Sequence, residues 1–228
     1  MRKVLLAIAA VALAGCSTDS AKQAPAGEKS APTKAAQAPD KFHVKFETTK
    51  GDFVMEVVRE WAPRGVDRFH ELIEEKFYDG SRFFRVRPKF VVQFGINKDP
   101  KVSELWRQLK LPDDPVVQKN TRGYVSFAKE GPGSRTTQIF INLADNSQRL
   151  DAKGFSPFAK VVEGMDVVDK LYATYGEVQS LGGSGPDPQK IEGLGEEYLE
   201  RNFPRLDKIT QAAVVNYTAK AAERSRRP

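Results

Sequence analysis

The chain has 228 residues, and its 36 Lys and Arg against 30 Asp and Glu give a formal net charge of +6. One cysteine excludes an internal disulfide, and two histidines without further ligands at matching spacing argue against a metal site. The basic residues are interspersed with acidic ones, so the charge does not indicate a nucleic-acid-binding surface. We therefore expect no cofactor, no metal and no nucleic-acid partner.

Residues 1–15 have the features of an export signal. Positive charge comes from Met1-Arg2-Lys3, and the apolar run Val4–Leu13 is too short to span a bilayer. The run Leu13-Ala14-Gly15-Cys16 resembles the bacterial lipobox, in which the cysteine is lipidated and becomes the mature N-terminus. We predict a signal peptide over residues 1–15 and a lipid anchor at Cys16. The alternative is an ordinary cleaved signal with an incidental thiol.

A polar segment follows over residues 17–40, dominated by Ala, Lys, Gln, Ser, Thr and Pro. It has too little apolar surface to fold, which predicts a disordered tether over residues 16–40 with a reach of roughly 25–30 Å. Ser17 after the cysteine, rather than Asp, resembles the proteobacterial signal for the outer membrane. The expected location is the cell envelope, facing the periplasm, on the outer membrane of a Gram-negative bacterium.

The globular part opens with a predicted hairpin and a predicted helix. Apolar and polar residues alternate over Val44–Val57 on both sides of Lys50-Gly51-Asp52, which is typical of a β-hairpin. Apolar residues at helical spacing then run from Pro63 to Phe77, which predicts an amphipathic helix ending near Lys76. This helix would close one end of a barrel.

Short strands dominate the rest of the chain. They are predicted over residues 83–86, 90–94, 124–128, 139–143, 155–162 and 209–215, the last beside the first strand. A second amphipathic helix is expected over residues 164–172, and a short one over residues 102–109 in which Trp106 covers the barrel. A helical stretch near residues 189–202 is predicted as an insertion, and residues 219–228 as a basic tail.

One segment combines strand composition with a cationic side chain, namely Phe83-Phe84-Arg85-Val86-Arg87-Pro88-Lys89-Phe90-Val91-Val92-Gln93-Phe94-Gly95. It places Arg85 among aromatic residues that would exclude water and strengthen the hydrogen bonds of the guanidinium. Such a place could hold an apolar group and polarise it.

This segment resembles the active-site segment of the cyclophilins, the peptidyl-prolyl isomerases whose usual form there is Phe-His-Arg-Val-Ile-Pro-Gly-Phe-Met-x-Gln-Gly-Gly. A second block, Phe127-Ala128-Lys129-Glu130-Gly131-Pro132-Gly133-Ser134-Arg135-Thr136-Thr137-Gln138-Ile139-Phe140-Ile141, resembles the family's Met-Ala-Asn-x-Gly-Pro-x-Ser-x-x-Ser-Gln-Phe-Phe-Ile. Shorter matches flank both over roughly residues 43–175. The resemblance implies a mainly β domain over residues 41–218, a closed antiparallel eight-stranded barrel capped by two helices, to which this chain adds a C-terminal helical insertion.

The resemblance also implies the reaction and its residues. Peptidyl-prolyl cis-trans isomerisation needs no nucleophile, and Arg85 is the candidate donor to the proline nitrogen, which becomes an acceptor as the bond twists. The expected substrate-binding residues are the apolar Phe90, Phe140 and Leu150, the polar Gln93 and Gln138, the peptide-binding stretch Ala128 and Lys129, and Phe155 near the family's pocket histidine. The expected partners are proline-containing polypeptides, above all unfolded envelope proteins, bound by a monomer.

The chain departs from the family pattern at three positions of the site. Phe84 replaces the usual histidine, Val91 replaces the usual methionine, and Arg149 stands where many members have tryptophan. Because that tryptophan helps to bind cyclosporin, we expect weak sensitivity to the drug. Phe155 lies in a loop that is one residue longer than usual.

The sequence also suggests two other functions. Hydrolase chemistry finds little support, because His43 and His70 are the only histidines and no Gly-x-Ser-x-Gly elbow is present. A lipid-anchored module of the same fold could instead bind proline-containing segments without catalysis, as a chaperone or scaffold. The changed residues around Arg85 favour the non-catalytic module, whereas the retained Arg85, Phe90 and Gln93 favour the isomerase.

Overall fold

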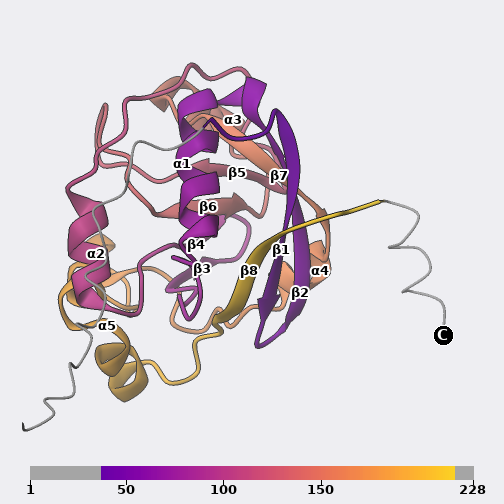
Figure 1. The fold of residues 1–228 in the computed structure, drawn as a ribbon. Helices are drawn as coiled ribbons and strands as arrows, with labels where there is room; N and C mark the ends of the chain where they lie inside the picture. The colour runs from indigo at the N-terminus through magenta and orange to yellow at the C-terminus, as the bar shows by residue number, and fades with distance from the viewer. Residues whose placement is uncertain (1–36, 219–228) are drawn as a thin grey trace, which may run out of the picture. The chain divides into compact units, whose positions relative to one another are not determined.

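The computed structural model describes residues 37–218, which form an antiparallel sheet curled around one apolar core (Figure 1). The predicted signal peptide, Cys16, most of the tether and the basic tail lie outside the described residues. No helix within residues 37–218 combines the length and apolar character needed to cross a membrane. The strands are β1 (Lys41–Thr48), β2 (Gly51–Val58), β3 (Arg85–Arg87), β4 (Val91–Phe94), β5 (Tyr124–Phe127), β6 (Ile139–Asn142), β7 (Pro157–Glu163) and β8 (Ile209–Val215).

The eight strands neighbour one another in the order β3-β4-β6-β5-β7-β2-β1-β8, and all pairs are antiparallel. The sheet curls until the start of β8 meets the residues that precede β3. Arg82 bridges Lys208, the Gly80 N–H donates to the Ile209 carbonyl at 2.8 Å, and the Ile209 N–H donates to the Ser81 carbonyl at 2.9 Å. The predicted eight-stranded barrel is confirmed, with a short bridge as its seam.

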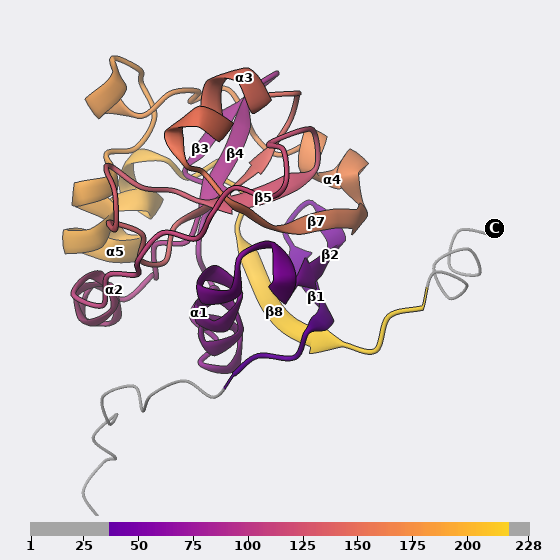
Figure 2. The same ribbon diagram turned by 90° about the horizontal axis from the view of Figure 1, so that it is seen from above.

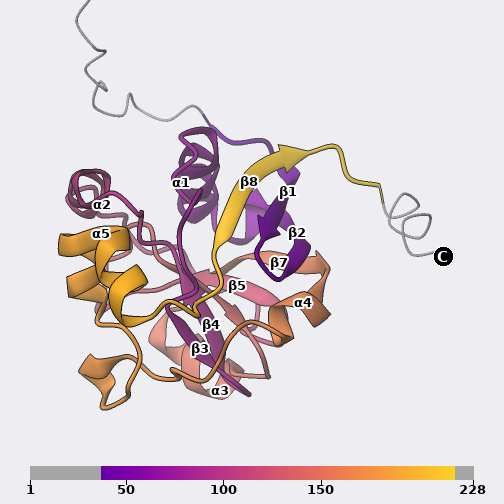
Figure 3. The ribbon, with the colours of Figure 1, turned by 90° about the horizontal axis from the view of Figure 1, so that it is seen from below.

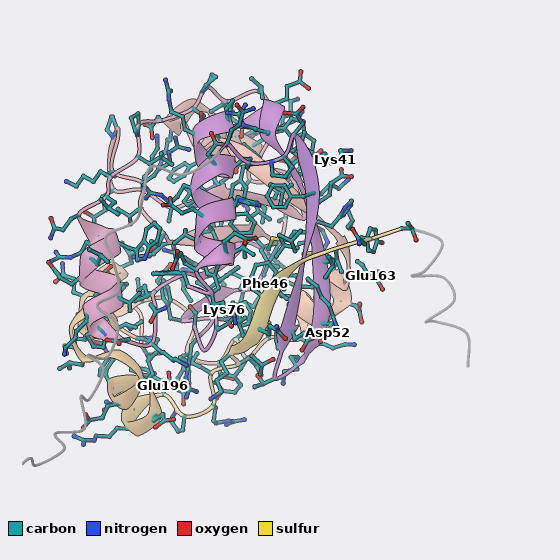
Figure 4. The ribbon with its side chains drawn as sticks, in the orientation of Figure 1. Lys41, Phe46, Asp52, Lys76, Glu163 and Glu196 are labelled. Atoms are coloured by element: carbon teal, nitrogen blue, oxygen red, sulfur yellow. The ribbon has the colours of Figure 1, made fainter. Side chains whose placement is uncertain are left out.

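The first hairpin shows how the alternation of residue types sets the register. Phe46 lies opposite Phe53, and both rings face the core, stacked at 5.0 Å between centroids. Both side chains are fully buried, and Phe46 lies on β1 in Figure 4. At the turn, Gly51 has a φ of 128°, a conformation that favours glycine, and the Thr48 hydroxyl donates to its carbonyl at 2.6 Å. The hairpin was predicted from this pattern.

Two helices cover the ends of the barrel, as expected. The longer one, α1 (Pro63–Glu74), begins with proline at its first turn and buries Val66, Phe69 and Leu72 against the core. The other, α4 (Met165–Asp169), is shorter than the predicted 164–172. Beyond its end, the Tyr172 N–H donates to the Asp207 carboxylate at 2.8 Å.

Short helical segments complete the loops: η1 (Arg59–Trp61), α2 (Pro100–Arg107), α3 (Ser147–Leu150), η2 (Asp151–Lys153) and η3 (Gln179–Leu181). Of these, α2 was predicted two residues later. Its Trp106 is buried in the main core and meets Phe77 edge-on at 5.9 Å, which confirms that this side chain covers the barrel. The 3-10 helices and α3 were not predicted.

The C-terminal insertion, here residues 177–206, lies beside the barrel and contains α5 (Pro188–Asn202), which packs against α2 in all three views (Figures 1, 2 and 3). A second apolar cluster joins the insertion to the barrel. Its members come from both: Phe84, Ile96, Val178, Ile191, Leu199, Phe203 and Leu206. The helix itself was predicted almost to the residue.

Two further contacts fix α5 on the barrel. Gly195 bends the helix with a φ of 63°, and a Cβ there would lie 2.3 Å from the Lys98 carbonyl oxygen, so only glycine permits this approach. The buried Arg82 donates through Nε to Glu196 at 3.1 Å and through Nη1 to the Leu206 carbonyl at 3.1 Å. Glu196 is labelled on α5 in Figure 4.

The packed part of the chain begins slightly before Lys41. Ala38 is buried, and its N–H donates to the Asp67 carboxylate at 3.0 Å. The Asp40 carbonyl accepts from the Arg59 N–H at 2.9 Å. A few residues that the sequence assigned to the tether therefore pack on the domain.

Candidate active site

Three of the predicted site residues form one row across neighbouring strands. Arg85 of β3 pairs with Gln93 of β4, and Gln93 pairs in turn with Phe140 of β6. Paired residues on adjacent antiparallel strands point to the same face of a sheet, so these three side chains lie side by side.

The row lies on the outer face of the barrel because residues alternate along each strand. Val92 and Phe94 belong to the main core, whereas Val91 lies on the other face in a small separate cluster with Phe140 and Leu150. Alternate residues of one strand thus belong to the core on one face and to the small cluster on the other.

A pocket of about 150 Å³ opens on this outer face. Eight predicted site residues line it, together with Val91: Arg85, Phe90, Gln93, Ala128, Lys129, Phe140, Leu150 and Phe155. Phe140 and Phe155 meet edge-on at 5.6 Å between ring centroids. A pocket of this size with aromatic walls suits a small apolar ring.

A buried network of amides holds the far wall of the pocket. The Asn120 side chain donates to the Asp151 carboxylate and to the Phe155 carbonyl, each at 2.8 Å. Its oxygen accepts from the Ser126 hydroxyl at 2.8 Å, and Asn146 donates to the Phe90 carbonyl at 2.8 Å. These bonds fix the backbone that carries Phe90 and Phe155, which settles the position of Phe155 in its longer loop.

Arg85 lies at the edge of the pocket with its side chain 15% exposed. Its Nη1 donates to Gln93 Oε1 at 2.9 Å, and its Nη2 donates to Glu177 Oε2 at 2.8 Å. The guanidinium also lies 5.5 Å from the centroid of the Phe90 ring. Because each Nη carries two hydrogens, each nitrogen keeps one N–H beyond these two bonds.

The predicted peptide-binding stretch, Ala128 and Lys129, borders the pocket, and part of its hydrogen-bonding capacity is already used. The Lys129 ammonium pairs with the Asp113 carboxylate at 2.9 Å and lies 5.6 Å from the Phe155 ring centroid. The Ala128 N–H already donates to the Gln138 carbonyl at 2.8 Å. Lys129 is therefore a wall of the pocket whose charge is already paired.

The comparisons with known proteins agree on one family. A family model described as cyclophilin type peptidyl-prolyl cis-trans isomerase/CLD matches residues 43–192. The chain is 36% identical over 186 residues to peptidyl-prolyl cis-trans isomerase B of Escherichia coli, a match that covers 76% of this chain and 99% of that protein. The chain belongs to the cyclophilin-type peptidyl-prolyl cis-trans isomerases. The predicted enzyme class is thereby confirmed.

A further relative supports the cyclophilin family, and solved structures support the fold. A peptidyl-prolyl cis-trans isomerase of Acinetobacter baylyi is 35% identical over 153 residues, which cover 60% of this chain and 78% of that protein. A crystal structure of a cyclophilin-type isomerase of Cryptosporidium parvum superposes with a TM-score of 0.55 at 18% identity, covering 78% of this chain and 99% of that one. The same protein was solved in the presence of the dipeptide Ala-Pro, with a TM-score of 0.54.

The three departures from the cyclophilin pattern have different surroundings. Phe84 turns away from the small pocket and is 1% exposed in the apolar cluster beneath the insertion. Val91 lines the pocket and keeps its apolar character. Arg149 lies with its guanidinium 4.4 Å from the Phe90 ring centroid, so a cation stacks on the pocket rim where many cyclophilins have tryptophan.

Gln138 lies outside the small pocket, in a neighbouring polar groove of about 850 Å³ between the barrel and the insertion. The two cavities share Arg85, Gln93, Ala128 and Lys129, so they form one continuous depression. The groove is bordered by charged residues of α2 and α5: Glu104, Arg107 and Glu192. It offers room for the chain on one side of a bound proline.

Glu177 is the residue at this site that sequence reasoning missed. Its carboxylate contacts both Arg85 and Arg87, at 2.8 and 2.7 Å. Burial raises the pKa of the Glu177 carboxyl, but hydrogen bonds from Arg85, the Val178 N–H and Arg87 outweigh burial and hold the pKa below its usual range. No signal in the sequence pointed to it, because it lies beyond the blocks that match the family pattern.

Proposed function

We propose that Arg85 catalyses the isomerisation by donating a hydrogen bond to the proline nitrogen of an Xaa-Pro bond. The observation that carries this proposal is the position of Arg85, which keeps unused N–H groups at the edge of an aromatic pocket the size of a proline ring.

Rotation about an Xaa-Pro bond is accelerated by such a donor. Amide resonance creates a barrier of about 18–20 kcal/mol to rotation. As the bond twists, the proline nitrogen recovers its lone pair and accepts a hydrogen bond that the planar amide cannot accept. An interaction made only in the twisted state lowers the barrier without tightening ground-state binding.

The strength of one hydrogen bond limits how much Arg85 can contribute to the rate. A hydrogen bond from a charged group is worth about 1.5–3 kcal/mol, which corresponds to roughly a ten- to hundredfold effect on rate. The remainder comes from orientation. Phe90, Phe140, Leu150 and Phe155 would hold the proline ring while the residue before it rotates, in a site with little water.

We further propose that the enzyme acts on unfolded envelope proteins from a lipid anchor at Cys16. The support lies in the export signal, the lipobox-like Leu13-Ala14-Gly15-Cys16 and the polar tether that follows. Ser17 supports the outer membrane as the destination. The expected partners are proline-containing segments of polypeptides in the periplasm, and we expect a monomer.

The mechanism is tested by cis-to-trans exchange of an Ala-Pro-Phe peptide with the full chain and its Arg85→Ala variant. We expect a folded Arg85→Ala protein to lose at least tenfold in kcat/KM, and Arg85→Lys to lose nearly as much, because an ammonium lacks the rigid fork. Wild-type protein that is folded and does not accelerate exchange would instead favour a non-catalytic module that binds proline-containing segments.

The anchor is tested separately, by fractionating cells that express the chain or its Cys16→Ser variant after labelling with radioactive palmitate. We expect label and outer-membrane association for the wild type and neither for the variant. A wild-type protein that carries no label and is released with the periplasmic fraction would contradict the anchor without affecting the mechanism.

A further inference from the structure

We propose that Glu177, which comes from the C-terminal half of the chain, is a positioning residue that fixes the guanidinium of Arg85 toward the proline pocket. This inference rests on the proposed role of Arg85 as the donor. It gives the insertion a part in the reaction, although the insertion contributes nothing to the small pocket itself.

The contact between the two side chains is close and shielded. Arg85 Nη2 donates to Glu177 Oε2 at 2.8 Å, and Arg85 Nε lies 2.5 Å from Oε1. The two side chains are 15% and 13% exposed, so solvent screens the pair less than it screens a surface ion pair. The carboxylate therefore holds the guanidinium by the hydrogen bond from Nη2 and the charge contact at Nε, while Gln93 holds Nη1.

Glu177 is itself held by its neighbours, so its carboxylate has a fixed position beside Arg85. Its Oε1 accepts from the Val178 N–H at 3.0 Å, and its carbonyl accepts from the Gly185 N–H at 2.7 Å. Gly183 packs so closely on this residue that a Cβ would lie 2.0 Å from the Glu177 carbonyl oxygen. A substitution at Gly183 would displace the backbone of Glu177.

The apolar cluster sets the register between the two residues. Val178, next to Glu177, and Phe84, next to Arg85, are both buried in the cluster that joins the insertion to the barrel. Packing of these two neighbours brings the acid and the arginine together across a sequence separation of 92 residues. This also gives a reason for an apolar residue at position 84.

A second series of hydrogen bonds, through Gln93, supports the same orientation of the Arg85 guanidinium. Gln93 Nε2 donates to Gln138 Oε1 at 3.0 Å, and Gln138 Nε2 donates to Glu192 Oε1 of α5 at 3.2 Å. A carboxylate only accepts, so it turns the amide nitrogen of Gln138 toward itself. The Gln138 oxygen then faces Gln93, whose own oxygen is left facing Arg85.

Loss of Glu177 would leave two like charges together. Arg85 and Arg87 both contact Oε2 of this one carboxylate, at 2.8 and 2.7 Å. Without it, the two guanidinium groups repel each other, and Arg85 is held only by Gln93 and the Phe90 ring. Displacement of a catalytic group by about 1 Å can cost up to about a hundredfold in rate.

The test is a cycle of variants in the full chain, measured by prolyl isomerisation of an Ala-Pro-Phe peptide with kcat and KM determined separately. We expect Glu177→Ala to lower kcat about tenfold with little change in KM, because Glu177 lines neither the small pocket nor the neighbouring groove. Glu177→Gln keeps the size and one acceptor oxygen and is expected to lose less. The matched control is Glu197→Ala, an exposed acid of α5 whose one ion pair within residues 37–218 is with Arg201 at the surface.

The decisive arm repeats Glu177→Ala in an Arg85→Ala background, where a residue that works through Arg85 has nothing left to position. We expect no further loss there. An equal loss in both backgrounds would overturn the inference in favour of general structural support. Unchanged kcat in Glu177→Ala and Glu177→Gln, with a loss in Arg85→Ala, would overturn it and leave the proposed mechanism standing. Unchanged activity of Arg85→Ala would overturn both.

Discussion

The two faces of strands β4 and β6 perform different tasks with the same stretches of chain. On the inner face, Val92, Phe94, Ile139 and Ile141 are at most 1% exposed in the main core. On the outer face, Gln93 and Phe140 lie in the row that carries Arg85.

The difference is one of chemistry as well as of position. The inner face is held by aromatic packing, such as the edge-on contact of Phe94 with Phe83 at 5.0 Å. The outer face is held by hydrogen bonds that run from Glu177 through Arg85, Gln93 and Gln138 to Glu192. Changes on the inner face should therefore act on stability, and changes on the outer face on activity.

The largest expected effect comes from truncating the inner face. Phe94→Ala should lower the free energy of unfolding by about 3–5 kcal/mol, because it opens a cavity in a closely packed core. Phe140→Ala, on the outer face, removes a ring that borders an open pocket, and we expect a smaller loss of stability with a clear loss of kcat/KM. Both values follow from denaturant unfolding and peptide exchange. Equal losses of stability, with unchanged activity of Phe140→Ala, would contradict the distinction between the faces.

The next largest effect concerns the contact between the barrel and the insertion. Glu196→Ala removes the nearer carboxylate from the buried guanidinium of Arg82 and leaves only Glu200 at 3.7 Å, and we expect a loss of about 1–3 kcal/mol in unfolding free energy. Glu197→Ala, one residue along the same helix but exposed, is the control. If both variants unfold at the same denaturant concentration as the wild type, the ion pair does not hold the insertion.

A smaller effect concerns the rim of the pocket. We expect weak inhibition by cyclosporin, because Arg149 stacks on Phe90 where many cyclophilins have tryptophan. Arg149→Trp should tighten inhibition about fivefold, since an aromatic contact contributes on the order of 1 kcal/mol. Inhibition titrations of both proteins decide this point. Nanomolar inhibition of the wild type would refute the prediction.

The smallest effect is a pH-dependent change at Glu192. Burial raises the pKa of this carboxyl, and the nearby Arg107 and Gln138 offset burial only in part. Above the pKa that this carboxyl has in the unfolded chain, its ionisation therefore lowers the free energy of unfolding. This destabilisation disappears as the pH falls through the pKa of the folded state and then that of the unfolded state. Glu192→Gln should melt slightly higher than the wild type at pH 7, and the gap should close near pH 4. A variant that melts lower at pH 7 would contradict this sign.

The sequence was sufficient for the parts of the fold that repeat locally. Alternation predicted the β1–β2 hairpin and the bounds of β8, and helical spacing predicted α1 and α5. The motif resemblance named eight residues that the structure brings into one pocket. These succeed because strand and helix periods, and a contiguous motif, are visible within short stretches.

The remaining features depend on contacts between distant parts of the chain. Glu177 meets Arg85 only because Phe84 and Val178 pack in one cluster, and neither pairing leaves a local pattern. The burial of Lys129 depends likewise on Asp113, which lies in a loop without a period of its own. The sequence alone could identify the motif residues, and it could not identify the residues that hold them.

The central claim is that Arg85 acts on the twisted state of the peptide bond, and NMR exchange spectra of an Ala-Pro-Phe peptide test it most directly. Such spectra give the dissociation constant of the peptide and its isomerisation rate on the enzyme in one experiment. We predict that Arg85→Ala lowers the bound-state isomerisation rate at least tenfold while the dissociation constant changes by less than about threefold. An Arg85→Ala protein that binds the peptide more weakly but isomerises the bound peptide at the wild-type rate would contradict the account.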